Sequence, residues 1–222
     1  MPRVNAVKKA RKAQGKCGRC GTDINVGDAY IWIKPRYGGK RVRCTDLACR
    51  FRASDLTGGK MSGVYAAQEN AEDSIGDMDS VEDIKNLAEE TADAIQEVAD
   101  EYQESADAIS EHFEGSSTAE ECEEQAQTLG DWAETIRDSV SDFSDDFEPT
   151  NGFNADGDRV CPECGGEVEE DGEYFICCDV IGCGAHGDLE DDEPRDDEGR
   201  TREEWVEAAR DALNDALSEC PC

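Results

Sequence analysis

Two pairs of cysteines near the start of this 222-residue chain have the spacing of metal ligands: Cys17-Gly-Arg-Cys20 and Cys44-Thr-Asp-Leu-Ala-Cys49. Each pair can place two thiolates on one ion across a tight turn, and four thiolates complete the closed tetrahedral shell of a structural zinc site. Disulfides are the alternative. We disfavour them because no apolar segment follows the basic start of the chain, so we expect no secretory signal and a cytoplasmic protein with reduced thiols. The spacing therefore predicts one zinc ion here.

A second group of cysteines in the C-terminal third predicts a zinc ribbon, in which two thiolate-bearing turns are joined by a short hairpin. We expect a strand at residues 174–176 between its two pairs. The third ligand is ambiguous: Cys177 competes with Cys178, which we favour because its gap to Cys183 repeats the gap of the second N-terminal pair, and His186 could substitute as a ligand. The expected cofactors are two Zn²⁺ ions per chain, the second held by Cys161, Cys164, Cys178 and Cys183.

Catalytic chemistry is not expected. Only His112 and His186 could serve as bases near neutral pH, and no nucleophile–base pair or phosphate-binding loop accompanies them. Both expected zinc shells are completed by four cysteines, which leaves no open coordination position for a substrate. The sequence therefore predicts a binding protein and not an enzyme.

Charge divides the chain near Lys60. Residues 1–60 contain 15 basic and 4 acidic side chains, a net charge of +11, whereas residues 61–222 contain 7 basic and 51 acidic side chains, a net charge of -44. This asymmetry indicates different partners for the two parts. Because +11 exceeds what solubility requires, we expect residues 1–60 to bind DNA or RNA. The expected contacts are Lys8, Lys9, Arg11, Lys12, Lys34, Arg36, Lys40, Arg41, Arg43, Arg50 and Arg52.

The aromatic side chains among these cations have two interpretations. Tyr30, Trp32 and Lys34 alternate onto one face of an expected strand, where the aromatic rings could stack on bases. Tyr30 and Trp32 could instead form the core of a domain too small to have another. We favour the second interpretation.

Local elements must bring the first two cysteine pairs together. Residues 30–34 and 40–44 predict two strands joined by a turn, and Thr45 or Asp46 could cap a short helix through Cys49 and Phe51. A knuckle, a hairpin and a helix with ligands at both ends resemble the treble-clef zinc fingers, including the PARP-type finger. The PARP-type finger has a His and a Cys where this chain has its second pair of cysteines.

Three further motifs resemble uncharacterised small zinc-finger proteins of tailed bacteriophages: Val7-Lys-Lys-Ala-Arg11, Cys17-Gly-Arg-Cys20 and Lys34-Pro-Arg-Tyr-Gly-Gly-Lys40. The resemblance covers roughly residues 1–145. It implies a phage or prophage origin and hence a place in the host cytoplasm, and it implies no particular activity.

An acidic helical region follows. Apolar residues recur at steps of three and four along residues 81–109 and again along residues 122–147, which predicts two helices packed as an antiparallel hairpin, and residues 62–75 could add a shorter helix. Ser117 with Glu120, or Thr118 with Glu121, can form a capping box for the second long helix. The acidic outer faces could mimic a nucleic-acid duplex or fold back onto residues 1–60. We favour the simpler interpretation of a solvated face.

The fold class expected is small zinc-stabilised modules plus all-α structure. Leu, Ile, Val and Phe together make up about 16% of the chain, which with a net charge of -33 excludes one large hydrophobic core. Thr201 and Glu204 can cap a last amphipathic helix that begins before Trp205. The expected parts are a basic finger (residues 1–60), an acidic helical hairpin (61–148), a zinc ribbon (149–190), and an acidic linker with a C-terminal helix (191–222).

These expectations combine into one function. The chain is predicted to be a non-enzymatic zinc-binding protein whose basic finger binds nucleic acid, while the acidic helices and the ribbon recruit or regulate a host or phage protein. The alternative is an acidic inhibitor or adaptor that mimics nucleic acid and acts on a protein target. No membrane partner is expected, because no apolar run approaches the roughly 18 residues of a membrane span.

Overall fold

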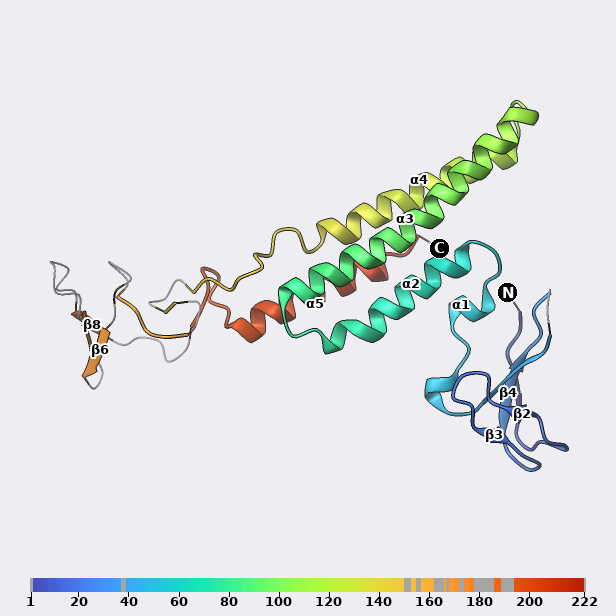
Figure 1. Cartoon of the computed structure of the whole chain (residues 1–222), viewed down its shortest axis with the longest axis horizontal. Helices are drawn as coiled ribbons and strands as arrows, with labels where there is room; N and C mark the ends of the chain where they lie inside the picture. Colours follow the sequence, from blue (N-terminus) through green and yellow to red (C-terminus); the bar gives the residue numbers. More distant parts are fainter. Residues whose placement is uncertain are drawn as a thin grey trace. The chain divides into compact units, whose positions relative to one another are not determined.

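The computed structural model describes residues 2–36, 39–149, 153–154, 157–161, 166, 168–171, 174–177, 186–188 and 194–221. Five α-helices and eight short strands in three antiparallel sheets occur among these residues (Figure 1). Contacts divide the chain into two compact units, residues 1–70 with 93–131, and residues 71–92 with 132–222. The four-part division expected from composition stays a prediction.

The finger, residues 1–60, contains two of the sheets. Strands β1 (Asn5–Val7), β4 (Tyr30–Ile33) and β5 (Arg41–Cys44) pair in the order β1-β4-β5, and strands β2 (Gly15–Lys16) and β3 (Asp23–Ile24) form a two-stranded ribbon. The expected hairpin is confirmed as β4 and β5, although residues 37–38 of its turn lie outside the described residues. The core beneath the sheets is small, and its buried members are Ala10, Cys17, Ile24, Tyr30 and Cys49.

A short helical segment leads out of the finger. Asp46 accepts the backbone N–H of Ala48 at 2.9 Å and so caps η1 (Leu47–Cys49), as expected, but the segment is a single 3-10 turn. Helices α1 (Ala53–Leu56) and α2 (Met61–Ser74) follow, and α2 is the shorter helix expected at residues 62–75. The hydroxyl of Ser54 donates to the Glu69 carboxylate at 2.6 Å, which ties α1 to α2.

The two long helices expected from the apolar spacing are confirmed. Helices α3 (Val81–His112) and α4 (Ser117–Asp138) run side by side and are joined by a short turn (Figure 1). Each helix contributes residues to both compact units. In the first unit the apolar stripe buries Ile95 and Leu129, and in the second unit it buries Ile84 and Ile136. The stripe is therefore the seam of the hairpin.

The end of α4 corrects the sequence prediction. The apolar spacing predicts helix as far as residue 147, but α4 ends at Asp138. The hydroxyl of Ser139 donates to the Ile136 carbonyl at 2.8 Å, and that of Ser141 donates to the Asp138 carbonyl at 2.9 Å. Such local bonds compete with the main-chain bonds of a helix. Beyond Asp138 the apolar residues still pack, although they are no longer helical. The centre of the Phe147 ring lies 5.6 Å from that of the Trp205 ring.

The C-terminal helix α5 (Arg202–Ser218) begins where expected. The Thr201 hydroxyl accepts the backbone N–H of Glu204, and the Glu204 carboxylate accepts the backbone N–H of Thr201 at 2.9 Å, so the capping box is confirmed. The inward face of α5 is apolar, with Leu213 fully buried. The indole N–H of Trp132 donates to the Ala216 carbonyl at 2.8 Å and joins α4 to α5 within the second unit.

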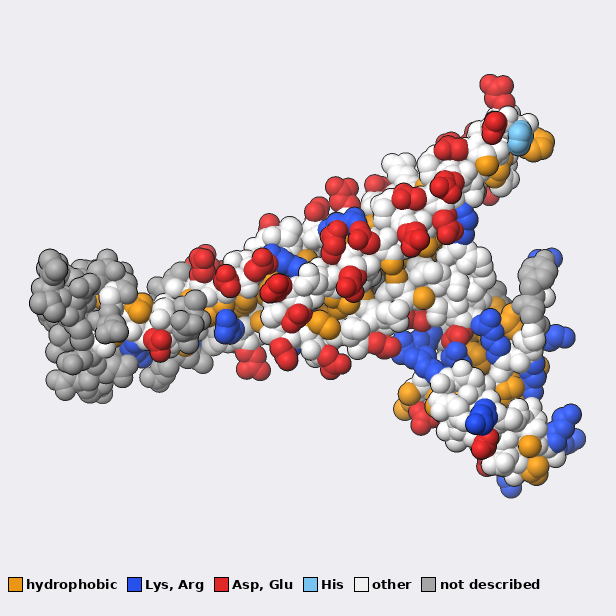
Figure 2. All heavy atoms as spheres, in the orientation of Figure 1, with side chains coloured by type: hydrophobic (Ala, Val, Ile, Leu, Met, Phe, Trp, Pro, Cys, Tyr) orange, Lys and Arg blue, Asp and Glu red, His pale blue; other side chains and the backbone are white. Residues whose placement is uncertain are grey.

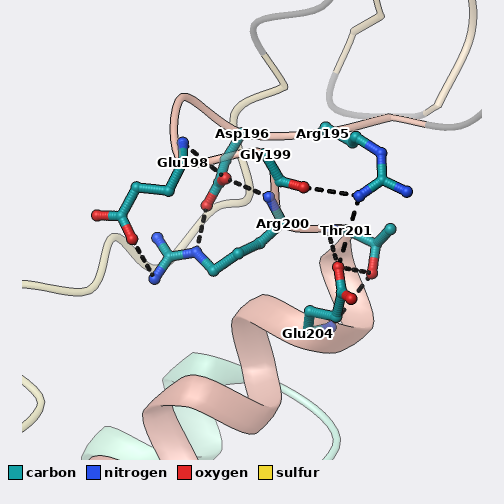
Figure 3. Close-up of polar contacts among 7 residues, drawn as sticks. All are labelled: Arg195, Asp196, Glu198, Gly199, Arg200, Thr201 and Glu204. Carbon is teal, nitrogen blue, oxygen red and sulfur yellow. Dashed lines mark hydrogen bonds and ion pairs between the residues drawn. The ribbon is translucent and has the colours of Figure 1, made fainter. Parts of the chain in front are cut away.

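Residues 195–200, expected to belong to a linker, form a turn before α5 (Figure 3). The Asp196 carboxylate accepts the backbone N–H groups of Glu198 at 3.0 Å and Arg200 at 2.8 Å, together with the Arg200 guanidinium at 2.8 Å. Gly199, with φ +78°, supplies the left-handed conformation that closes the turn. An aspartate, a glycine and an arginine thus stabilise the entry to the last helix.

The expected ribbon is described only in part. Strands β6 (Val168–Asp171), β7 (Tyr174–Cys177) and β8 (His186–Asp188) pair in that order, which confirms the strand at residues 174–176. Cys161 is buried, while Cys164, Cys178 and Cys183 lie outside the described residues. The second zinc site stays a prediction. No helix in the described part of the chain combines the length and apolarity needed to cross a membrane.

Candidate metal centre and basic surface

The finger brings its four cysteines into one group. The Sγ atoms of Cys17, Cys20, Cys44 and Cys49 all lie within 4.8 Å of one another, and those of Cys20 and Cys44 are 3.7 Å apart. A zinc–sulfur bond of about 2.3 Å places neighbouring sulfurs of a tetrahedron about 3.8 Å apart, whereas a disulfide requires about 2.05 Å. The group therefore fits a metal ion held by four thiolates, and its cysteines are free thiols here.

Two short elements present these cysteines. Cys17 and Cys20 lie on the turn between β2 and β3, where Gly21 has φ +74° and donates its N–H to the Cys17 carbonyl at 3.1 Å. The other two ligands lie at the end of β5 and at the end of η1. The N–H of Gly18 donates to the Val42 carbonyl at 2.9 Å and fixes the turn against β5. Local backbone hydrogen bonds thus shape the turn that carries Cys17 and Cys20 and hold it against β5.

Hydrogen bonds favour ionisation of the first pair. Burial alone would raise the pKa of Cys17, but three backbone N–H groups, those of Cys20, Arg19 and Cys44, outweigh it and lower the pKa to about 6. The hydroxyl of Thr22 lies 3.3 Å from Cys20 Sγ, and it lowers the pKa of that thiol as well. Donors of this kind support metal-bound thiolates. Thr22 was not among the site residues predicted from the sequence, although it lies only two positions after Cys20.

The thiols of the second pair, Cys44 and Cys49, have raised pKa values when no metal is bound. Burial raises the pKa of Cys44, and burial with the neighbouring thiols raises the pKa of Cys49 to about 12. A thiol must lose its proton to bind a metal. Binding of a divalent cation to this group therefore releases protons and weakens as the pH falls.

Most cations expected to contact nucleic acid lie on the surface of the finger. Figure 2 shows Lys and Arg side chains gathered there, while Asp and Glu side chains cover the helices. Arg43 and Arg52 differ from the others because they are half-buried. The exposed residues are Lys8, Lys9, Arg11, Lys12, Lys34, Arg36, Lys40, Arg41 and Arg50.

Arg43 has a structural partner that the sequence did not suggest. Its guanidinium makes a bidentate ion pair with the Asp55 carboxylate, with N–O distances of 2.6 and 2.7 Å, and stacks 4.6 Å from the centre of the Phe51 ring. Both charged side chains are largely shielded from water, at 13% and 15% exposed. Arg43 thus ties β5 to α1. Arg41, two residues earlier on the same strand, is exposed to solvent.

The aromatic residues of the finger serve its fold. Tyr30 is only 7% exposed and belongs to the finger core, which supports the favoured interpretation. The Lys40 ammonium lies 4.9 Å from the ring centres of both Tyr30 and Trp32 and donates to the Gln14 side chain at 3.0 Å. These rings are covered by a cation of the same chain.

Lys60 is the last residue of the basic region and contacts α3 within the first unit. Its ammonium donates to the Ser105 hydroxyl at 2.8 Å and to the Glu101 carbonyl, and it lies 5.0 Å from the centre of the Tyr102 ring. The end of the basic region is thereby fixed to α3 of the acidic region.

Comparisons of the chain with protein-family models, curated proteins and solved structures find no match.

Proposed function

We propose that residues 1–60 form a treble-clef-like zinc finger that binds DNA or RNA. The supporting observation is the juxtaposition, within one small fold, of a four-cysteine group and twelve exposed cations, nine of which are the expected contacts. Four soft thiolates in a closed tetrahedron favour Zn²⁺ and leave no coordination position for a substrate. The metal therefore has a structural role, and the exposed cations provide the binding chemistry.

The acidic remainder of the chain does not prevent this binding. At physiological ionic strength, charges separated by more than about 8 Å of solvent are largely screened. A phosphate at the surface of the finger thus responds to the nearby Lys and Arg side chains more than to the total charge of -33. The acidic helices and the C-terminal ribbon are then available to recruit or regulate a protein, with a second zinc ion in the ribbon.

Salt dependence of binding tests the nucleic-acid proposal. The full-length chain is titrated with fluorescent single-stranded and duplex oligonucleotides between about 50 and 200 mM salt, where each neutralised phosphate adds roughly 0.7 to 0.9 to the logarithmic slope. We expect measurable binding at the lower salt concentration and a slope that indicates several phosphate contacts. Absence of binding to every oligonucleotide at low salt contradicts the proposal.

Charge-neutralising variants identify the surface responsible. The variant K8Q/K9Q/R11Q/K12Q, near the start of the finger, should bind more weakly and show a shallower salt slope, because four exposed cations are lost. The control is Arg202→Gln at the start of α5, which removes one exposed cation from the acidic part of the chain and should bind as the wild type does. Equal weakening per removed charge in the two variants would mean that only total charge matters.

A further inference from the structure

A cleft lies beside the β4–β5 hairpin, within the first unit. Its volume is about 780 Å³, and one wall is formed by the hairpin with Lys34 and Arg41. The opposite wall is the segment that joins α1 to α2, with Thr57, Gly58 and Gly59. The cleft is thus bounded by a cationic strand pair on one side and by a backbone loop on the other.

Three cations of the hairpin line the cleft, Lys34, Arg36 and Arg41. The side chains of Lys34 and Arg41 are exposed, and no ion pair or hydrogen bond engages either of them among the described residues. Asp55 also lines the cleft, but both of its carboxylate oxygens are paired with Arg43. The charge available to a ligand in this cleft is therefore positive.

The loop wall contributes a hydroxyl that lacks a partner. Thr57 Oγ1 is buried and has no hydrogen-bond partner in the described part of the chain. Buried polar atoms in folded proteins nearly always have a partner, so an orphan hydroxyl in the wall of a cleft indicates a ligand that can accept its proton. A phosphate oxygen is such an acceptor, and it also suits the two cations opposite.

A second cleft shares one lining residue, Arg41, with the first. It has a volume of about 320 Å³, and its lining includes Lys16, Lys40 and Arg43 beside Arg41, which lines both clefts. Two cationic hollows that share one arginine match a ligand with successive phosphates better than a single small anion. Nucleic acid has that repeating chemistry.

On these grounds, and on the premise that the finger binds nucleic acid, we propose that the larger cleft holds one backbone phosphate of the bound strand. Lys34 and Arg41 neutralise this phosphate, and the Thr57 hydroxyl donates to one of its oxygens. The strand then passes Arg41 into the smaller cleft, where Lys16 and Lys40 meet the next phosphate. Arg41 is the central contact because it faces both.

The test compares matched substitutions in the full-length chain. Arg41→Gln and Arg19→Gln each remove one exposed arginine from the finger, but Arg19 lines neither cleft. The probes are single-stranded DNA and RNA oligonucleotides of about 12 nucleotides, within the usual span of small nucleic-acid-binding folds. Arg41→Gln should weaken binding about fivefold to tenfold and lower the salt slope by about 1, well beyond the effect of Arg19→Gln.

Two further variants distinguish the loss of a charge in the cleft from the loss of a hydrogen bond, and folding is checked separately. Lys34→Gln should also weaken binding and lower the slope, while Thr57→Val, which keeps the side-chain shape, should weaken binding about twofold to threefold at an unchanged slope because no charge is lost. Metal content and circular dichroism confirm that each variant is folded. Comparison of the DNA and RNA oligonucleotides shows which nucleic acid the clefts bind more tightly.

Failure of this inference differs from failure of the proposed function. If the wild type does not bind either oligonucleotide, the nucleic-acid proposal itself is wrong. If the wild type binds but Arg41→Gln and Arg19→Gln weaken binding equally, and Thr57→Val has no effect, the finger binds nucleic acid elsewhere and the cleft assignment is overturned.

Discussion

The finger and the helical hairpin bury their apolar residues in different ways. Two of the five buried residues in the finger core, Cys17 and Cys49, are members of the four-cysteine group. The hairpin is held by aliphatic residues along its seam, such as Ile84, Ile95 and Ile136, each fully buried. A metal ion held by this group would provide in the finger what side-chain packing provides in the helices.

This difference follows from size and composition. Domains of the finger's length bury little apolar surface and are only marginally stable, and metals commonly compensate. The helices are long enough to bury a continuous stripe even though their outer faces are acidic. The two regions should therefore respond differently to loss of metal and to loss of packing.

Removal of the metal should give the largest effect. Structural zinc contributes roughly 10–16 kcal/mol in small fingers, more than the entire stability of many domains, about 5–15 kcal/mol. The chain has three tryptophans, Trp32 in the finger and Trp132 and Trp205 in the second unit. Chelation should shift the indole N–H signal of Trp32 in a ¹H–¹⁵N spectrum and leave helical circular dichroism nearly unchanged.

Cysteine variants provide the control for this experiment. Cys17→Ser should reproduce the effect of chelation on Trp32, whereas Cys122→Ser, on α4 and outside the four-cysteine group, should not. An unchanged Trp32 signal after chelation would show that packing alone maintains the finger.

Loss of packing in the helical region should be the next largest effect. Leu213 of α5 is fully buried, so Leu213→Ala should destabilise the helical region by about 2–5 kcal/mol in urea unfolding followed at 222 nm. The same substitution at Leu47, which is 71% exposed in the finger, should change stability by less than about 0.5 kcal/mol. Similar losses from both variants would contradict the burial described here.

A single buried hydrogen bond should have a smaller effect. Trp132→Phe removes the indole N–H that donates to the Ala216 carbonyl and leaves that oxygen without its donor. The expected cost is about 1–3 kcal/mol, measured by the same urea titration. The Trp32 signal should not move, because the finger belongs to the other unit.

The turn before α5 should show the smallest effect, visible only through pH. Burial raises the pKa of Asp196, but the hydrogen bonds from Arg200 and Glu198 outweigh it and hold the pKa below its usual value. The resulting stabilisation is present above the unfolded pKa of about 3.9 and is lost as the pH falls through the lower folded value. Wild type and Asp196→Asn should therefore differ in thermal midpoint from pH 7 to 5 and converge below about pH 4. A gap that persists at pH 2 would show that the carboxylate charge is not its cause.

Much of the fold could be predicted from local patterns. The cysteine spacing predicted the four-cysteine group, alternation predicted the β4–β5 hairpin, and the apolar stripe predicted α3 and α4. Capping residues predicted the starts of η1 and α5. Each of these features is indicated by residue types at short spacings, including the two close cysteine pairs whose members meet in one group.

The remaining features depend on contacts between distant residues. Arg43 was expected to face a ligand, but Asp55, twelve residues later, takes its guanidinium. The larger cleft beside Arg41 requires the loop at Thr57 to lie near the hairpin, which no local pattern reveals. Helix α4 ends early because serine hydroxyls compete for its carbonyl groups, although the apolar spacing continues.

Native mass spectrometry of the zinc-loaded chain tests the central claim most directly. The wild type and the double variant C17S/C49S are compared under identical conditions, so that any metal bound by the C-terminal cysteines contributes equally to both. The double variant should carry one zinc ion fewer than the wild type, because its four-cysteine group has lost two ligands. An equal zinc content in the two proteins would contradict the metal site in the finger.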